Sequence, residues 1–149
     1  MSNKTITVGI VGGGRVGVSF AKILGQKQNV SVTGIVTSTP KRQRELNEQL
    51  GVEAFGTIDE MLEKDNKPQI VCVVNANDAH AEATLKALEA DCHVYLEKPM
   101  APTLEECVRI VEAEKRSKGQ LQVGFEYIHG TMTGRVRALL REGYFGEPL

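Results

Sequence analysis

The sequence predicts an α/β fold, a doubly wound parallel sheet. Short apolar runs alternate with helix-like stretches along the whole chain, which is typical of repeated βαβ units. Several runs are continuously apolar, such as residues 70–74, as strands need to be when helices cover both faces of a sheet. The glycine pattern Gly12-x-Gly14-x-x-Gly17 follows the first apolar run directly.

The individual elements can be assigned in order from this alternation. The apolar run 5–11 predicts a strand that ends at the glycines, and the amphipathic stretch 15–24 predicts the helix after it. The later apolar runs predict strands over residues 30–37, 52–55, 70–74, 93–96 and 121–125, of which 52–55 is a short extra candidate. The stretches between them predict helices over 41–50, 58–64, 78–90 and 104–118. Two helix starts carry a capping-box pattern, Thr57 with Glu60 and Thr103 with Glu106.

Each of the three glycines has its own physical reason to be there. Gly12 permits a sharp turn, Gly14 lets the backbone approach a pyrophosphate, and Gly17 lets the helix pack close to the strand. The pyrophosphate would then face the free amides of the first helical turn, which includes Arg15 and Val16, and the positive end of the helix dipole. A turn without a ligand is the alternative interpretation. A P-loop is not favoured, because Gly-Lys-Ser/Thr does not follow the glycines.

Composition places the chain among ordinary globular domains. Its 149 residues are 41% hydrophobic and carry a formal net charge of -1, which gives no reason to expect nucleic acid or a membrane as partner. The N-terminus shows no signal peptide, and no apolar run reaches the roughly 18 residues that a bilayer needs. The three cysteines are an odd number without metal-ligand spacing, so we expect no metal site and reduced thiols in a cytoplasmic protein.

Charge is distributed unevenly along the chain. No Asp or Glu precedes Glu45, so the first βαβ unit is cationic and suits a polyanionic cofactor, unless the bias is an accident of surface composition. The basic residues of this region are Lys4, Arg15, Lys22, Lys27, Lys41, Arg42 and Arg44.

The end of the second strand predicts which dinucleotide is bound. An NAD site usually has an acidic residue there, about 20 residues after the glycines, to bind the ribose hydroxyls. This chain has Thr37 and Ser38, followed by Lys41 and Arg42, and no acid. Hydroxyls and cations would hold a 2'-phosphate through charge-assisted hydrogen bonds. The pattern favours NADP over NAD, although use of both cofactors, or a merely solvated basic face, remains an alternative.

A second motif, Glu97-Lys98-Pro99, follows the strand 93–96. In an open parallel sheet, ligands bind outside the carboxyl ends of the strands near the topological switch point. Lys98 would therefore lie in the same crevice as the nicotinamide. A lysine that is simply exposed to solvent at the end of a strand is the alternative.

Together these segments resemble the Gfo/Idh/MocA family of NAD(P)-dependent oxidoreductases. The resemblance covers essentially the whole chain and depends on the glycine turn, His80, the segment 87–90 and the segment 93–99. It implies that Lys98 lies beside the nicotinamide and binds or polarises the substrate oxygen as the catalytic residue. It also implies that Glu97 belongs to the cofactor site, and that the peptide bond before Pro99 is often cis.

Two loops depart from the family pattern. Relatives tend to show Thr-Pro-Asn-x-x-His where this chain has Asn75-Ala-Asn77-Asp-Ala-His80, so Asn77 and His80 match and Asn75 does not. The resemblance implies that this loop lines the nicotinamide ribose, with a helix-face histidine that contacts no ligand as the alternative for His80. An Arg-Phe pair common in sugar-active relatives is absent after residues 124–125, so Tyr127 and His129 either contact substrate or serve in packing.

The resemblance also implies a missing half. We expect residues 1–124 to form the dinucleotide-binding Rossmann domain, and 125–149 to be a linker and first helix leading to an absent C-terminal substrate domain. In relatives that domain carries the acid/base residues and joins the subunits of a homo-oligomer. The full protein would transfer a hydride between NAD(P) and a sugar, polyol or related small carbinol, and this chain alone would be inactive. A non-catalytic NAD(P)-sensing regulatory module is the alternative.

Overall fold

The computed structural model describes residues 5–147. Its strands are β1 (Ile6–Val11), β2 (Val30–Val36), β3 (Ala54–Phe55), β4 (Ile70–Val73), β5 (His93–Glu97) and β6 (Leu121–Gly124). Its α-helices are α1 (Arg15–Gly25), α2 (Pro40–Leu50), α3 (Ile58–Leu62), α4 (His80–Glu89), α5 (Leu104–Arg116) and α6 (Thr131–Arg141), with 3₁₀ turns η1 (Asn77–Ala79) and η2 (Glu126–His129). The predicted domain limits 1 and 149, and Lys4 of the basic set, lie outside the described residues.

All six strands form one parallel sheet in the order β3-β2-β1-β4-β5-β6. The predicted doubly wound α/β fold is confirmed. The chain winds outward from β1 in one direction through β2 and β3, then returns to the other side of β1 and continues through β4, β5 and β6. The topological switch point lies between β1 and β4, and a crevice opens there because the loops after these two strands lead to opposite faces.

The core has two halves, one on each face of the sheet. Side chains alternate along each strand, so Ile10 of β1 packs with α1 and α2 on one face, whereas Val11 packs on the other face with α3, α4 and α5. Strands covered on both sides cannot tolerate polar residues, which explains the continuous apolar runs in the sequence. The face of β5 that carries Tyr95 is less covered, since that side chain is only partly buried, against Phe20 of α1.

One of the two predicted capping boxes forms completely. The Thr103 side chain accepts from the backbone N–H of Glu106, and the Glu106 carboxylate accepts from the backbone N–H of Thr103, each at 3.2 Å. At the start of α3 the Thr57 side chain caps the helix in the same way. The second half of that box was predicted wrongly, because the Glu60 carboxylate accepts from the N–H of Gly56 instead, at 2.9 Å.

Most predicted elements differ from the structure only at their ends. The predicted helix 78–90 is divided into η1 and α4, and the predicted helix 104–118 stops at Arg116. The backbone of Ser117 is extended, and its hydroxyl donates to the carbonyl oxygen of Leu88 at 2.7 Å. A tertiary hydrogen bond therefore accompanies the end of α5, and local sequence patterns do not show it.

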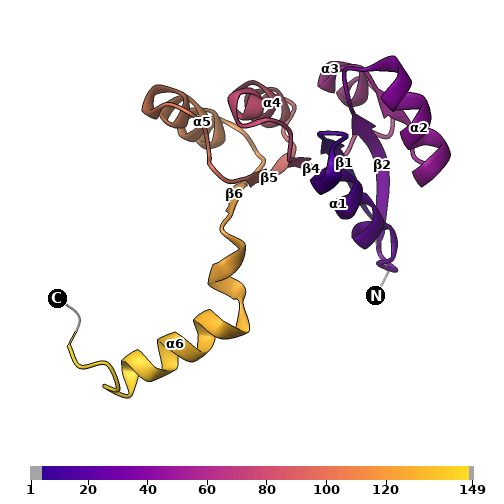
Figure 1. Cartoon of the computed structure of the whole chain (residues 1–149). Coiled ribbons are helices and arrows are strands. Elements are labelled where there is room, and N and C mark those ends of the chain that lie inside the picture. The colour runs from indigo at the N-terminus through magenta and orange to yellow at the C-terminus, as the bar shows by residue number, and fades with distance from the viewer. Residues whose placement is uncertain (1–4, 148–149) are drawn as a thin grey trace.

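The segment after β6 leaves the sheet as an arm, defined here as residues 126–147 (Figure 1). Neither η2 nor α6 has a buried residue. Several apolar side chains of the arm are exposed, and Tyr127 and Met132 are each 78% exposed. Within residues 5–147, no helix is long and apolar enough to cross a bilayer, and no cluster of three or more His, Cys, Asp or Glu side chains is arranged to hold a metal ion.

Candidate functional site

A pocket of about 610 Å³ opens at the carboxyl ends of β1, β2 and β4, at the switch point of the sheet. Its walls come from the glycine turn and first turn of α1, the end of β2, and the loop after β4. Among the residues predicted to bind cofactor, those that line it are Gly12, Gly14, Arg15, Val16, Thr37, Ser38 and Asn75. The pocket is also lined by Val11, Gly13, Val36, Gly56, Val74, Ala76 and Ala79, which the sequence analysis did not single out.

The glycine turn has the geometry that its three predicted roles require. Gly12 has φ of 125°, in the left-handed region, and a Cβ there would come within 2.8 Å of the backbone of Val74 and Asn75. A Cβ on Gly17 would overlap the carbonyl oxygen of Gly12, so α1 can pack against the turn only with glycine at that position. Gly14 differs from both, because a Cβ there would meet nothing within 4 Å. Gly14 is therefore free of packing constraints in the protein itself, and it lines the pocket.

A fourth glycine, Gly13, was missed by sequence reasoning. A Cβ on Gly13 would lie 2.7 Å from Cβ of Thr37 and 2.9 Å from Cδ1 of Leu46, so this residue lets the turn close against β2 and α2. Its carbonyl oxygen accepts a hydrogen bond of 3.0 Å from Nε of Arg42. The run of three consecutive glycines was the available signal, and the G-x-G-x-x-G pattern left its middle member without a role.

The residues at the end of β2 fall into two groups. Thr37 and Ser38 line the pocket, whereas Lys41 and Arg42 do not. The guanidinium of Arg42 bonds to Gly13, and its Nη1 forms an ion pair with Glu45 at 3.0 Å. Arg42 is thus engaged with the protein, while Lys41 is exposed at the first turn of α2.

The loop after β4 holds a buried, unpaired polar atom in Asn75, one of the residues that line the pocket. Nδ2 of Asn75 donates to the carbonyl oxygen of Ala79 at 3.2 Å, but its Oδ1 is buried without any hydrogen-bond partner within the described residues. An unpaired buried acceptor costs free energy unless a ligand supplies the donor. Asn77, two residues on, is exposed and does not line the pocket.

His80, the first residue of α4, is 0% exposed and does not line the pocket. Its Nδ1 lies 2.7 Å from the carbonyl oxygen of Pro99, and its Nε2 lies 3.3 Å from the carbonyl oxygen of Asn75. The structure therefore gives no support to direct contact between His80 and a cofactor in this pocket. His80 is also not a helix-face residue without partners, because both ring nitrogens lie close to backbone carbonyl oxygens.

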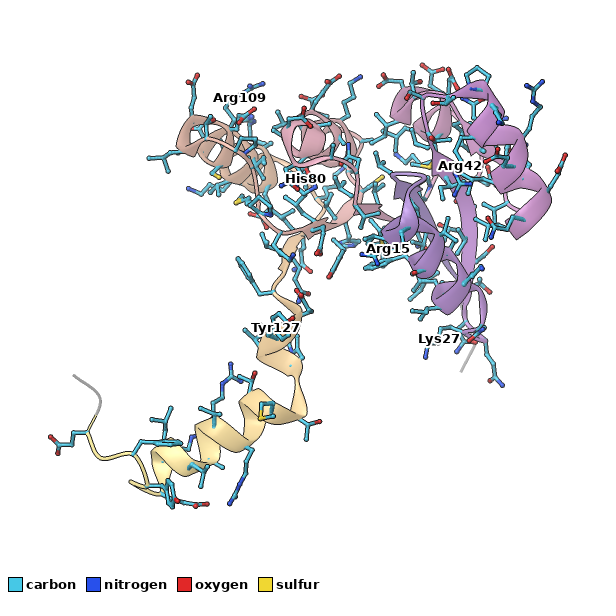
Figure 2. All side chains as sticks on the ribbon, viewed as in Figure 1. Arg15, Lys27, Arg42, His80, Arg109 and Tyr127 are labelled. Atoms are coloured by element: carbon cyan, nitrogen blue, oxygen red, sulfur yellow. The ribbon has the colours of Figure 1, made fainter. Side chains whose placement is uncertain are left out.

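Glu97 and Lys98 lie at the end of β5, outside the lining of the pocket. The Lys98 side chain is 51% exposed, and its Nζ is 3.9 Å from Oε1 of Glu97. The Lys98–Pro99 peptide bond is cis, as the family resemblance implied. Tyr127 and His129 lie in η2 on the arm, both exposed. Figure 2 shows Tyr127 in the segment that leads away from the sheet.

These residues suit a dinucleotide chemically. Gly14, at the N-cap of α1, provides no side-chain cap, and the first turn has no acidic residue, so its amides and the positive end of the dipole remain available to an anion. Arg15 adds a cation at the same end (Figure 2). The open space at Gly14 and the unpaired Oδ1 of Asn75 then provide room for a pyrophosphate and an acceptor for a sugar hydroxyl or an amide.

Comparison with known proteins identifies the family. The model of an oxidoreductase family with an NAD-binding Rossmann fold, Gfo/Idh/MocA, matches residues 6–125. The chain belongs to the Gfo/Idh/MocA family. The resemblance inferred from the sequence is thereby confirmed, and the structure has the Rossmann fold that the family model describes.

The relatives of this Gfo/Idh/MocA chain include several inositol dehydrogenases. It is 30% identical over 148 residues to inositol 2-dehydrogenase of Salmonella typhimurium, covering 97% of this chain and 44% of that protein. It is 30% identical over 146 residues to inositol 2-dehydrogenase/D-chiro-inositol 3-dehydrogenase of Lactiplantibacillus plantarum, covering 95% of this chain and 41% of that protein. The chain therefore spans less than half the length of these relatives.

A solved structure shows the same fold with ligands present. The scyllo-inositol dehydrogenase of Lactobacillus casei, with bound NAD(H) and scyllo-inositol, superposes with a TM-score of 0.87 at 26% identity, covering 97% of this chain and 43% of that one. That relative binds its cofactor and a polyol.

Proposed function

We propose that this chain binds NAD(P) in the pocket at the switch point, as the cofactor-binding half of an oxidoreductase that acts on a CH–OH group. The observation that carries the proposal is the glycine turn, where Gly14 faces open space beside the free amides of α1. A sugar, polyol or related carbinol is the substrate class. The inositol dehydrogenases among the relatives favour a polyol.

Each group of residues has a separate task in this proposal. The amides of the glycine turn, with Arg15 and Val16, hold the pyrophosphate, and Thr37 and Ser38 contact the adenosine ribose. Asn75 contacts the ribose or amide of the nicotinamide half. The cofactor, when bound, supplies the hydride chemistry. Lys98 stabilises negative charge that develops on the substrate oxygen, while the acid/base residue belongs to the second domain that the resemblance implies.

NADP remains the preferred cofactor in the proposal, with NAD as the second choice. None of the pocket-lining residues within 5–147 is acidic, and Ser38 stands where an acid would bind the ribose hydroxyls. Lys41 is exposed nearby on α2 and supplies the cation. Arg42 loses the direct role that the sequence suggested, because its guanidinium is engaged with Gly13 and Glu45.

The remaining proposals concern the whole protein. We place the domain boundary after Gly124, where β6 ends. A cytoplasmic location is favoured by three free cysteines, and a homo-oligomer formed through the second domain is favoured by the family resemblance. The enzyme is favoured over the regulatory module, because the relatives named above are dehydrogenases by name.

Titration of the purified chain with NADH and NADPH, followed by nicotinamide fluorescence, tests the proposal directly. We expect saturable binding of both dinucleotides and no oxidation of myo-inositol at an enzymatic rate. Absence of binding would refute the cofactor assignment. Turnover that survives purification and disappears in Lys98→Ala would show instead that the active site is complete in this chain.

A further inference from the structure

His80 connects two loops that the proposed function treats separately. The loop after β4 lines the pocket through Asn75, Ala76 and Ala79, whereas the loop after β5 carries Lys98. His80 begins α4 between them in the chain, and Figure 2 shows it inside the molecule beneath that helix. Its two ring nitrogens reach one backbone carbonyl in each loop, Pro99 and Asn75.

The shorter contact has a defined direction. A carbonyl oxygen can only accept, so Nδ1 of His80, at 2.7 Å from the Pro99 oxygen, carries the proton and donates it. The hydrogen bond spans nineteen residues of sequence and joins the fully buried His80 side chain to the exposed residue Pro99, so it is partly buried. Because its donor is removed from solvent, this hydrogen bond helps to fix the position of the backbone that it holds.

The longer contact reaches the pocket. Nε2 of His80 lies 3.3 Å from the carbonyl oxygen of Asn75, whose side-chain Oδ1 is the unpaired buried acceptor there. Nδ2 of Asn75 is held in turn by the carbonyl oxygen of Ala79, the residue before His80. With its proton on Nδ1, a neutral imidazole has only a lone pair at Nε2 and cannot donate to the Asn75 carbonyl oxygen, so this second contact is one of packing. A change in the position of Asn75 on cofactor binding would still displace the imidazole that lies against it.

From this arrangement we infer that His80 is a positioning residue that couples the cofactor pocket to the loop bearing Lys98. The inference rests on the proposed function, because it requires NAD(P) in the pocket and Lys98 at the substrate. His80 itself touches neither. Its role is to hold the Lys98–Pro99 backbone in register with Asn75, so that cofactor binding orders the lysine.

The matched variants are His80→Asn and His80→Leu. The two side chains have nearly the same shape and are equally shorter than imidazole, but only Asn keeps a donor at the position of Nδ1. Thr84→Val is the control, since Thr84 is also buried in α4 and its hydroxyl has no partner within the described residues. We expect Leu to weaken NADH binding about fivefold, as loss of one hydrogen bond would, and Asn and the control to stay within about twofold of wild type.

Amide hydrogen exchange distinguishes a positioning role of His80 from a merely structural one. In wild type and Thr84→Val, NADH should slow exchange at Lys98 and Met100, and in His80→Leu that protection should be lost although residual NADH binding is saturated. Equal affinity and equal protection in the Leu and Asn variants would overturn the inference while leaving the proposed function intact. Failure of wild type to bind NADH or NADPH would overturn both.

Imidazole NMR of the wild-type chain covers the case in which neither variant folds. We expect the His80 ring to carry its proton on Nδ1 and its nitrogen signals to shift when NADH is added. A ring with Nδ1 unprotonated, or one whose nitrogen signals do not shift at saturating NADH, would overturn the inference.

Discussion

Nε of Arg42 donates a hydrogen bond of 3.0 Å to the carbonyl oxygen of Gly13, the middle residue of the glycine turn. The contact ties α2 to the loop that precedes α1, across 29 residues of sequence. The Arg42 side chain is about a third exposed and also pairs with Glu45. Its positive charge is therefore partly screened by solvent and partly compensated by the Glu45 carboxylate. The hydrogen bond therefore holds the glycine turn against α2.

Replacing Arg42 with Ala should therefore weaken NADH and NADPH binding equally, by about fivefold, the effect of losing one hydrogen bond worth roughly 1 kcal/mol. Lys41→Ala is the matched comparison on the same helix turn, and it should weaken NADPH alone. Parallel fluorescence titrations with both cofactors measure the two ratios. A loss confined to NADPH in Arg42→Ala would mean that its guanidinium contacts the 2'-phosphate after all.

Gly14→Val should abolish dinucleotide binding without disturbing the fold. The side chain would occupy the open space where the pyrophosphate approaches, yet its Cβ would meet no protein atom within 4 Å. Gly25→Val, at the last residue of the same helix and equally open, should bind normally. Calorimetric titration and urea unfolding measure affinity and stability. Unimpaired affinity in Gly14→Val would show that the glycine turn does not bind the dinucleotide.

Ser38→Asp should reverse the cofactor preference. In wild type at low salt we expect NADPH to bind at least tenfold more tightly than NADH, because one charge-assisted hydrogen bond contributes roughly 1.5 to 3 kcal/mol. Added salt should reduce that ratio, since an exposed phosphate contact is screened. The new carboxylate would repel the phosphate and accept from the ribose hydroxyls. Equal affinities in wild type at low salt would reduce Lys41 to a solvated surface residue.

Cys72 should be the slowest of the three cysteines to react with iodoacetamide. Burial raises the pKa of its thiol from 9.0 to about 12, because the thiolate would be desolvated inside the sheet. At pH 9 the folded chain should therefore keep Cys72 protonated, while half of the same thiols ionise in the unfolded chain. Stability linked to this group is complete below pH 9 and is lost as the pH rises toward 12. Mass spectrometry of the labelled peptides checks the order, with half-buried Cys107 expected first.

The sheet and its helices could be predicted because their signals are local. A run such as residues 70–74 is apolar throughout only if both faces are covered, and the Thr103 and Glu106 pair acts within one helical turn. Gly17 is equally local, since a Cβ there would overlap the carbonyl oxygen of Gly12, whereas Gly12 itself lies against the backbone of Val74 and Asn75, which are distant in sequence. The predicted end of α5 was wrong by two residues, and at the observed end Ser117 donates to a distant carbonyl oxygen, that of Leu88, which no local pattern shows.

The sequence by itself determined the fold class and the family, and it predicted the place on the chain where a dinucleotide would bind. Only the tertiary structure decided which polar side chains line the pocket at that place. Arg42 and His80 were predicted to contact cofactor, but their nitrogens meet the carbonyl oxygens of Gly13 and Pro99, 29 and 19 residues away. Residue type and spacing show what a side chain can bind, whereas its partner depends on which backbone groups the fold brings within hydrogen-bond distance.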